Sequence, residues 1–457
     1  MSYFTKILIA LLFSNLVVCT TFAVEHDRPN VVLILSDDQG WQDYGFMGSN
    51  VVQTPHLDRL ARNSLLFERG YVVSPLCRPS LASIVTGLFP HQHGVCANDV
   101  SPASGLERQK ANQPVYESFH RHPSWIRTLV ENGYLAFQSG KWWEGSWHDG
   151  GFTHGMTHGD STRGGRHGDE GLKIGRQGLA PITQFIDQAV AAEKPFVVWY
   201  APFIPHTPHN PPPEILKKYQ IAGRPVNLAR YYAMCEWFDS TCGELLGHLE
   251  KHQITDNTLV VFLADNGWAA RDDTSKLPEG WWNDYAPRSK GSPFEEGIRT
   301  PIMISWPEAI PPGRSTDLAS SVDVMPTVLN ACGLNTPADL PGIDLRDETA
   351  RRNRDTVFGA AYSIHNMNPG DPESTLQYRW CIQDTWKLIL RSHGSDITRY
   401  KTVHEWDDVP ARLYNLKLDP GENKNLSSEE QETVRELSKR IAEVIPATFE
   451  DRSTPTN

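Results

Sequence analysis

The stretch Pro29-Asn-Val-Val-Leu-Ile-Leu-Ser-Asp37-Asp38 decides the fold class, because a continuous apolar run ends there in two carboxylates. Such a run without polar alternation is typical of a strand buried on both faces. Similar runs occur at residues 196–200, 259–263 and 302–305, with a weaker one at 134–138. Helix-like stretches separate them, at 55–64, 77–85, 124–132, 181–192 and 228–249. We therefore predict an α/β fold with a mainly parallel central sheet flanked by helices.

The last third of the chain predicts a smaller α+β subdomain. Trp386-Lys-Leu-Ile-Leu390 has the composition of a strand, and residues 429–444 place Val434, Leu437, Ile441 and Val444 on one helical face. We place the boundary near Asn335, in a polar segment that contains proline. The predicted catalytic domain is 24–335 and the C-terminal subdomain is 336–457.

Residues 1–23 predict a signal peptide, with Lys6 before an apolar run at 7–18 and a small residue at Ala23. The run is shorter than the roughly 20 residues that a membrane-spanning helix needs. No other segment is long and apolar enough to cross a membrane, so we expect a secreted or periplasmic protein without a membrane span.

Composition excludes some classes of function. A formal net charge of -12 argues against binding to nucleic acid or to an anionic membrane surface. Seven cysteines in 457 residues are too few for a disulfide scaffold. Cys235 and Cys242 fall seven residues apart in one predicted helix, which puts their Cα atoms roughly 10 Å apart, beyond disulfide reach.

Polar side chains follow four of the five predicted strands, and ligands of open parallel sheets bind at the carboxyl ends of the strands. They are Asp37-Asp38, Lys141, His206 and Asp265-Asn266. Each alone is explained by helix capping or an Asx turn. Together, three carboxylates and a carboxamide are oxygen ligands for a hard divalent cation, with Ca²⁺ the first choice and Mg²⁺ the second. Lys141, His206 and Lys290 could then hold an anionic substrate and move protons.

Cys77 is a candidate nucleophile at the start of the helix predicted at 77–85. Pro79 near its first turn and Gly87 near its end are ordinary helix punctuation. A helix N-terminus favours an anion or an ionised nucleophile. For a single cysteine taken alone, however, a buried structural role is the more common one.

The ordered motifs of this chain resemble those of the type I sulfatases in the alkaline-phosphatase-like superfamily. They are Pro29 to Asp38, Thr54-Pro-His-Leu-Asp58, Cys77-Arg-Pro-Ser with Thr86-Gly87, Gly140-Lys141-Trp142, Pro205-His206-Thr-Pro-His209, Ala264-Asp265-Asn266-Gly267, Lys290-Gly291 and Leu413-Tyr-Asn-Leu-Lys-Leu-Asp419-Pro. Matches in this order along nearly the whole mature chain are specific, whereas Cys-x-Pro-Ser alone would be weak.

The resemblance implies hydrolysis of a sulfate ester. Cys77 would be converted to formylglycine by a formylglycine-generating or equivalent maturation enzyme, and calcium would be held by Asp37, Asp38, Asp265, Asn266 and residue 77. One hydroxyl of the aldehyde hydrate would attack sulfur, the alcohol would depart, and the second hydroxyl would expel sulfate to regenerate the aldehyde. Lys141, His206 and Lys290 fall where the family contacts sulfate and protonates the leaving alcohol.

This chain departs from the family pattern at two positions. Leu81 stands where an arginine is usual, which removes a cation near the modified residue, and Trp143 stands where a histidine is usual. Candidate replacements are Arg78 or Arg163 for the charge, and a histidine among His148, His154 and His158.

We expect the substrate to be a sulfated carbohydrate, bound partly by the segment 142–178, which is rich in Gly, His and Arg. The predicted substrate ligands are Arg78, His148, Arg163, Arg166 and His209. A solvated loop is the ordinary alternative, and the tryptophans at 142, 143, 147, 281 and 282 would suit sugar stacking or simple packing. Two other functions remain open: a phosphoester or phosphonate hydrolase, and a non-catalytic binder of sulfated glycans.

Overall fold

A computed structural model describes residues 28–100, 105–160, 162, 167–271, 285–392 and 409–447. The predicted signal peptide, Arg163, Arg166, Trp281 and Trp282 lie outside the described residues.

Eight strands form the large sheet, in the order β4-β3-β5-β1-β6-β7-β2-β8. Their bounds are β1 Asn30–Ser36, β2 Leu65–Tyr71, β3 Leu135–Gly140, β4 His154–Gly155, β5 Phe196–Ala201, β6 Thr258–Ala264, β7 Arg299–Ser305 and β8 Gly313–Ser320. Among these strands only β7 runs against the others, pairing antiparallel with β6 and β2. The predicted mainly parallel sheet is confirmed.

Both faces of the sheet are buried, as the uninterrupted apolar runs require. In β1, Val31, Leu33 and Leu35 belong to the hydrophobic core on one face, and Val32 and Ile34 to the core on the other. Strands β5 and β6 divide their side chains in the same way. Successive side chains of a strand point to opposite faces, so an apolar residue is needed at every position.

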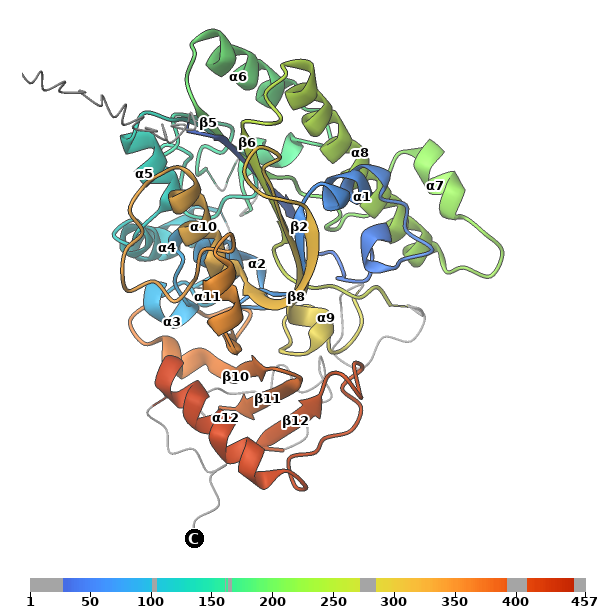
Figure 1. Cartoon of the computed structure of the whole chain (residues 1–457), viewed down its shortest axis with the longest axis vertical. Helices are drawn as coiled ribbons and strands as arrows, with labels where there is room; N and C mark the ends of the chain where they lie inside the picture. The colour runs from blue at the N-terminus through green and yellow to red at the C-terminus, as the bar shows by residue number, and fades with distance from the viewer. Residues whose placement is uncertain are drawn as a thin grey trace, which may run out of the picture.

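Helices cover both faces (Figure 1). Side chains of α1 Pro55–Arg62, α6 Ala180–Ala191 and α8 Val226–Lys251 join one core, and those of α2 Cys77–Thr86, α4 Gly105–Phe119, α5 Trp125–Glu131 and α10 Val324–Ala331 join the other. The remaining α-helices are α3 Pro90–His93, α7 Pro213–Tyr219, α9 Glu295–Ile298, α11 Glu348–Asn353 and α12 Gln431–Val444. Short 3₁₀ helices lie at Gly45–Met47, Asp169–Lys173, Ser321–Asp323 and Pro372–Thr375.

The C-terminal part contains a second, antiparallel sheet in the order β12-β11-β10-β9, with α12 along it (Figure 1). Its strands are β9 Thr356–Tyr362, β10 Leu376–Gln383, β11 Trp386–Arg391 and β12 Ala411–Asn415. Tyr71 and Val72 of the large domain share a core with Val357 and Trp380 of this sheet. The α+β subdomain is confirmed, whereas its boundary near Asn335 stays a prediction.

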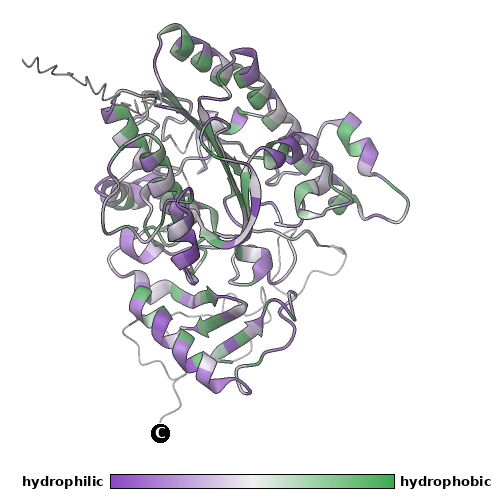
Figure 2. Ribbon diagram, in the orientation of Figure 1, coloured by the Kyte–Doolittle hydropathy of each residue, from purple (hydrophilic) through white to green (hydrophobic). Residues whose placement is uncertain are grey.

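The sequence missed strands β2 and β8 because both are partly polar. Strand β2 reads LLFERGY, and the first half of β8 is largely exposed at the edge of the sheet. Figure 2 shows the contrast between the hydrophobic central strands and the largely hydrophilic outer helix α11. A search for continuous apolar runs finds the fully apolar strands and overlooks partly polar strands such as β2 and β8.

Two further predictions concern cysteines and membranes. The six cysteines of the described residues, including Cys235 and Cys242, are free and buried, as expected for that pair. Within the described ranges, no helix has both the length and the apolar character needed to span a bilayer.

Candidate active site

The carboxyl ends of four neighbouring strands position most of the predicted site. Asp37 and Asp38 follow β1, Lys141 follows β3, and Asp265 follows β6, while His206 lies in the loop after β5. Because the strand order is β3-β5-β1-β6, these loops meet at one edge of the sheet. The Asp37 N–H donates to the Ile204 carbonyl, which joins the first loop to the loop of His206.

Backbone constraints hold two of these loops in place. Asp38 has a positive φ of 61°, and its N–H donates to Asp265 Oδ1 at 3.1 Å. Gly140 has φ +78°, and a Cβ there would lie 1.8 Å from the Ala201 carbonyl oxygen. Only glycine lets the backbone come this close to Ala201. The backbone nitrogen of the following Lys141 then donates to the same carbonyl oxygen at 2.7 Å.

Cys77 is the first residue of α2 and is buried. Asn98 Oδ1 accepts a hydrogen bond from the N–H of Arg78, so a side chain satisfies part of the helix N-terminus. The Gly291 N–H donates to the Pro75 carbonyl and brings Lys290 to the same place, with Nζ 3.2 Å from Cys77 Sγ. Burial raises the pKa of the Cys77 thiol to about 12, so the unmodified thiol is protonated near neutral pH.

Two buried lysines lie among three buried carboxylates. Lys141 Nζ is 2.6 Å from Asp37 Oδ1 and 3.0 Å from Asp265 Oδ2, and Lys290 Nζ is 2.6 Å from both oxygens of Asp38. Burial raises the pKa of Asp37 well above its ordinary value. For Asp38, burial acts in the same direction, but Lys290, His206 and Lys141 more than offset it and lower the pKa.

The donor set of this cluster fits a divalent cation. Asp37 Oδ2 and Asn266 Oδ1 are buried oxygens without a hydrogen-bond partner among the described residues. Buried polar atoms normally have a partner, so two such oxygens beside carboxylates indicate a ligand of positive charge. Four side chains also offer one ligand atom each within 4.8 Å of one another, those of Asp37, Asp38, Cys77 and His206.

His206 is held in one orientation. Its Nδ1 lies 2.7 Å from the Thr207 carbonyl oxygen, which can only accept, so Nδ1 carries a proton and Nε2 faces Asp38 Oδ2 at 3.4 Å. The Phe203 ring stacks on the imidazole at 4.2 Å, and Arg176 donates to the carbonyls of both Phe203 and His206. Burial, reinforced by Lys290 and Lys141 and opposed by Asp38, lowers the pKa of His206 well below its ordinary value.

Arg78, a predicted substrate ligand and replacement cation, has its guanidinium engaged elsewhere. It is buried, and its Nε and Nη2 donate to the two oxygens of Glu144 at 2.7 and 2.8 Å. Its Nη1 donates to Asn112 Oδ1 and to the Asn98 carbonyl. A bidentate pair of this kind joins α2 to the segment after β3.

The two positions that depart from the family pattern are both buried. Leu81 packs in the core on the α2 side of the sheet, and Trp143 lies in the same core with its ring 4.5 Å from that of His167. His148, His154 and His158 are exposed, and within the described chain none hydrogen-bonds to or stacks on a residue of the cluster.

His167 is the histidine that sequence reasoning missed, since its ring centroid is 5.7 Å from that of His206. The only sequence signal was its place in the segment 163–169, which attracted attention for its arginines. His209 lies at the border of the site, 6.1 Å from the Trp268 ring, and Lys290 Nζ is 5.9 Å from that ring.

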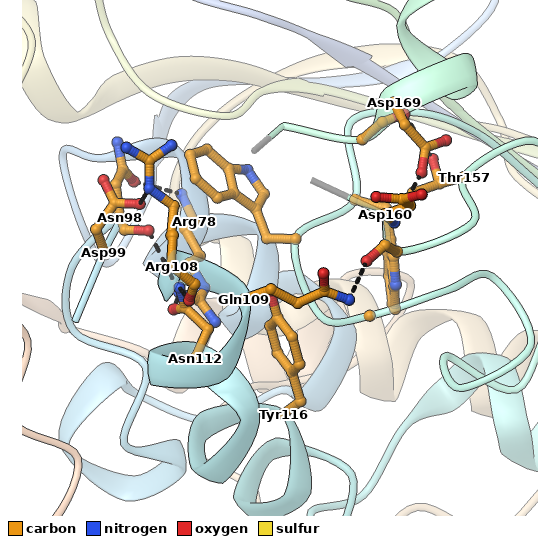
Figure 3. A pocket seen from close by; sticks show the side chains of 15 residues that line it. Arg78, Asn98, Asp99, Arg108, Gln109, Asn112, Tyr116, Thr157, Asp160 and Asp169 are labelled. Atoms are coloured by element: carbon orange, nitrogen blue, oxygen red, sulfur yellow. Dashed lines mark hydrogen bonds and ion pairs between the residues drawn. The ribbon is translucent and has the colours of Figure 1, made fainter. Parts of the chain in front are cut away.

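A polar pocket lies beside the cluster. Two of its lining residues, Arg78 and Trp142, directly follow Cys77 and Lys141 in the chain. Figure 3 shows its lining, which includes Asn98, Asp99, Arg108, Gln109, Asn112, Tyr116, Thr157, Asp160 and Asp169. Gln109 reaches across it to the Gly159 carbonyl, and Arg108 pairs with Asp99 at 3.4 Å. Its lining is rich in charged and amide side chains, but its volume of about 30 Å³ leaves room for only one or two water molecules, so a sugar ring does not fit in it as it stands.

Known proteins share both the sequence and the fold. A family model described as Sulfatase matches residues 29–334, and one described as N-sulphoglucosamine sulphohydrolase, C-terminal, matches 289–447. Pig N-acetylgalactosamine-6-sulfatase is 30% identical over 90% of this chain and 84% of its own length. The dog protein of that name is also 30% identical, over 69% of this chain and 65% of its own length. Human arylsulfatase A is 26% identical over 87% and 83%.

Solved structures agree on the fold. The structure of BT4656 in complex with its substrate D-glucosamine-2-N,6-O-disulfate has a TM-score of 0.67 at 21% identity, covering 93% of this chain and 100% of that one. The phosphonate monoester hydrolase of Agrobacterium radiobacter has a TM-score of 0.64 at 16% identity, covering 91% and 95%.

The sheet, and the carboxylates, lysines and cysteine gathered at its carboxyl edge, define a hydrolase of the alkaline-phosphatase-like superfamily. Within that superfamily the chain belongs to the sulfatase family, because the family model matches more than half of its length. Its enzyme class is therefore sulfuric ester hydrolase.

Proposed function

We propose that this protein removes sulfate from a carbohydrate ester, with residue 77 as the nucleophile after Cys77 has been converted to formylglycine. The observation that carries the proposal is the placement of Cys77 at a helix N-terminus, with the Lys290 ammonium at 3.2 Å and further buried charges around it. A sulfate ester carries its negative charge on three terminal oxygens, and the fixed cationic groups of this cluster can stabilise that charge as it develops on the reacting group.

Calcium is the proposed metal, with magnesium second, and Asp37, Asp38, Asp265, Asn266 and residue 77 are its proposed ligands. The bound ion would supply Lewis-acid charge that neutralises the sulfate oxygens. The oxygen-rich donor set and the two buried oxygens without partners support this assignment.

Lys141, Lys290 and His206 would act directly on the substrate. The Lys141 ammonium bridges Asp37 and Asp265, and the Lys290 ammonium pairs with Asp38; both would turn their remaining donors to the sulfate oxygens. His206 is fixed by Thr207 and Phe203 and presents Nε2 to the cluster. Because the neutral ring carries its proton on Nδ1, Nε2 would first take up a proton, which an anionic substrate beside it favours, and would then deliver that proton to the leaving alcohol.

A sulfated sugar is the proposed substrate, and the likeness to pig N-acetylgalactosamine-6-sulfatase supports it. The BT4656 structure, which is named for a disulfated glucosamine, shares this fold. His148, His209, Arg163 and Arg166 remain proposed substrate ligands. For Arg78, the bidentate pair with Glu144 favours a supporting role over direct contact.

Secretion or export to the periplasm is proposed on the signal-like sequence of residues 1–23. Intact-mass measurement of the exported protein would show a new N-terminus near Val24. Retention of Met1 on exported protein would contradict the proposal.

A panel of defined sulfated saccharides tests the function, with the same saccharides lacking sulfate as controls. The proposal predicts release of inorganic sulfate by the wild type and none by Cys77→Ala. A second arm offers phosphate and phosphonate monoesters, because a phosphonate hydrolase shares the fold. Faster turnover in that arm would favour the phosphoester alternative, and saccharide binding without sulfate release by the formylglycine form would favour a glycan-binding protein.

A further inference from the structure

A second group of metal-ligating side chains lies on helices α6 and α8, away from the carboxyl edge of the sheet. Asp187 of α6 has Oδ1 at 2.8 Å from His248 Nε2 and at 2.7 Å from His252 Nε2. One ligand atom from each of the three residues lies within 4.8 Å of the others. His248 belongs to the last turn of α8, and His252 directly follows that helix.

This group is separate from the candidate active site. Helix α6 leads into the amino end of β5, and α8 leads into the amino end of β6. Asp37, Lys141 and Asp265 follow the carboxyl ends of their strands, at the opposite edge of the sheet. Neither the proposed reaction nor the family motifs use Asp187, His248 or His252.

The geometry suits a metal ion that arrives from solvent. The two histidines are four residues apart on one helical face, so their rings lie side by side with centroids 4.8 Å apart. Their side chains are 12% and 23% exposed, and that of Asp187 is 51% exposed. An ion can therefore reach all three, and water can complete its coordination.

We propose that Asp187, His248 and His252 form a binding site for a divalent transition metal ion, with zinc as the first candidate. Two imidazole nitrogens and one carboxylate oxygen are ligands that zinc accepts, whereas calcium prefers oxygen alone. The partial negative charge at the C-terminus of α8 also favours a cation there. The bound ion would join α6 to α8, which pack in the same core.

The rival explanation is a hydrogen-bonded pair of histidines on one carboxylate, without metal. It predicts the same contacts, so metal stoichiometry must decide. The protein should be full-length, mature and untagged, because a polyhistidine tag would bind the same ions. Excess Ca²⁺ should be present throughout to occupy the candidate active site.

Equilibrium dialysis against Zn²⁺ then compares the wild type with His248→Gln/His252→Gln and with the control variant His122→Gln. The proposal predicts that the double variant loses one zinc equivalent, while His122→Gln keeps it, and that Asp187→Asn weakens binding by roughly tenfold or more. Zinc should raise the Tm of the wild type and not that of the double variant. Equal zinc stoichiometry in the wild type and a folded double variant would overturn the proposal. Sulfate release should be the same in both proteins.

Discussion

The ammonium nitrogen of Lys290 lies 3.2 Å from Cys77 Sγ and 2.6 Å from each carboxylate oxygen of Asp38. One buried cation therefore contacts both the candidate nucleophile and a candidate metal ligand. Leu81 cannot provide such a contact, so Lys290, together with Lys141, supplies the positive charge beside residue 77.

Replacing Lys290 with alanine should lower kcat for sulfate release by at least about a hundredfold, because a preorganised cation at the developing charge is lost. Steady-state kinetics on the formylglycine form would measure the effect. Lys110→Ala is the matched control, since Lys110 is exposed and its one ion pair among the described residues is with Glu107, three residues away. Turnover within a factor of three of the wild type for Lys290→Ala would remove Lys290 from the reaction.

Introducing the arginine usual in the family, by Leu81→Arg, should destabilise the protein by about 3 kcal/mol or more. Leu81 packs among apolar side chains, and burying an unpaired charge there is costly. Leu81→Met, which preserves volume, should cost less than about 1.5 kcal/mol. Urea denaturation of both variants makes the comparison. A stable Leu81→Arg protein with higher activity would show instead that the site lacks a cation.

Removing divalent ions with a chelator should abolish sulfate release and lower the Tm, because the carboxylates of Asp37, Asp38 and Asp265 would repel one another. Calcium should restore both properties more fully than magnesium. Asp265→Asn should require more calcium for half-maximal recovery. Full activity of protein shown by elemental analysis to be free of metal would contradict the calcium assignment.

Removing the partner of Arg78 by Glu144→Ala should lower the free energy of unfolding by about 3–5 kcal/mol, because it leaves a buried guanidinium unpaired. The control is Glu250→Ala, which breaks the exposed pair between Arg59 and Glu250 and should cost about 1 kcal/mol or less. Similar losses in the two variants would show that the Arg78 pair is not the buried support described above.

The sequence predicted best the features set by local pattern. Strand β1 was predictable because both of its faces are buried, and the positions of Asp37, Lys141 and Asp265 followed from the ends of the strands. Roles for these residues came from the family resemblance, since a carboxylate after a strand is common without any chemistry.

What the sequence could not supply depends on contacts between distant segments. Glu144 pairs with Arg78 across 66 residues, and His167 reaches His206 across a separation that includes α6 and β5. Pairing of this kind is decided by tertiary packing. For that reason three exposed histidines were named as replacements and His167 was not.

Peptide mass spectrometry across Cys77 tests the central claim most directly, on protein exported by its source or made with a formylglycine-generating enzyme. The account predicts a peptide lighter by the difference between a thiol and an aldehyde, in protein that releases sulfate. An unmodified thiol in protein that still releases sulfate would contradict it, because the reaction would then not use formylglycine.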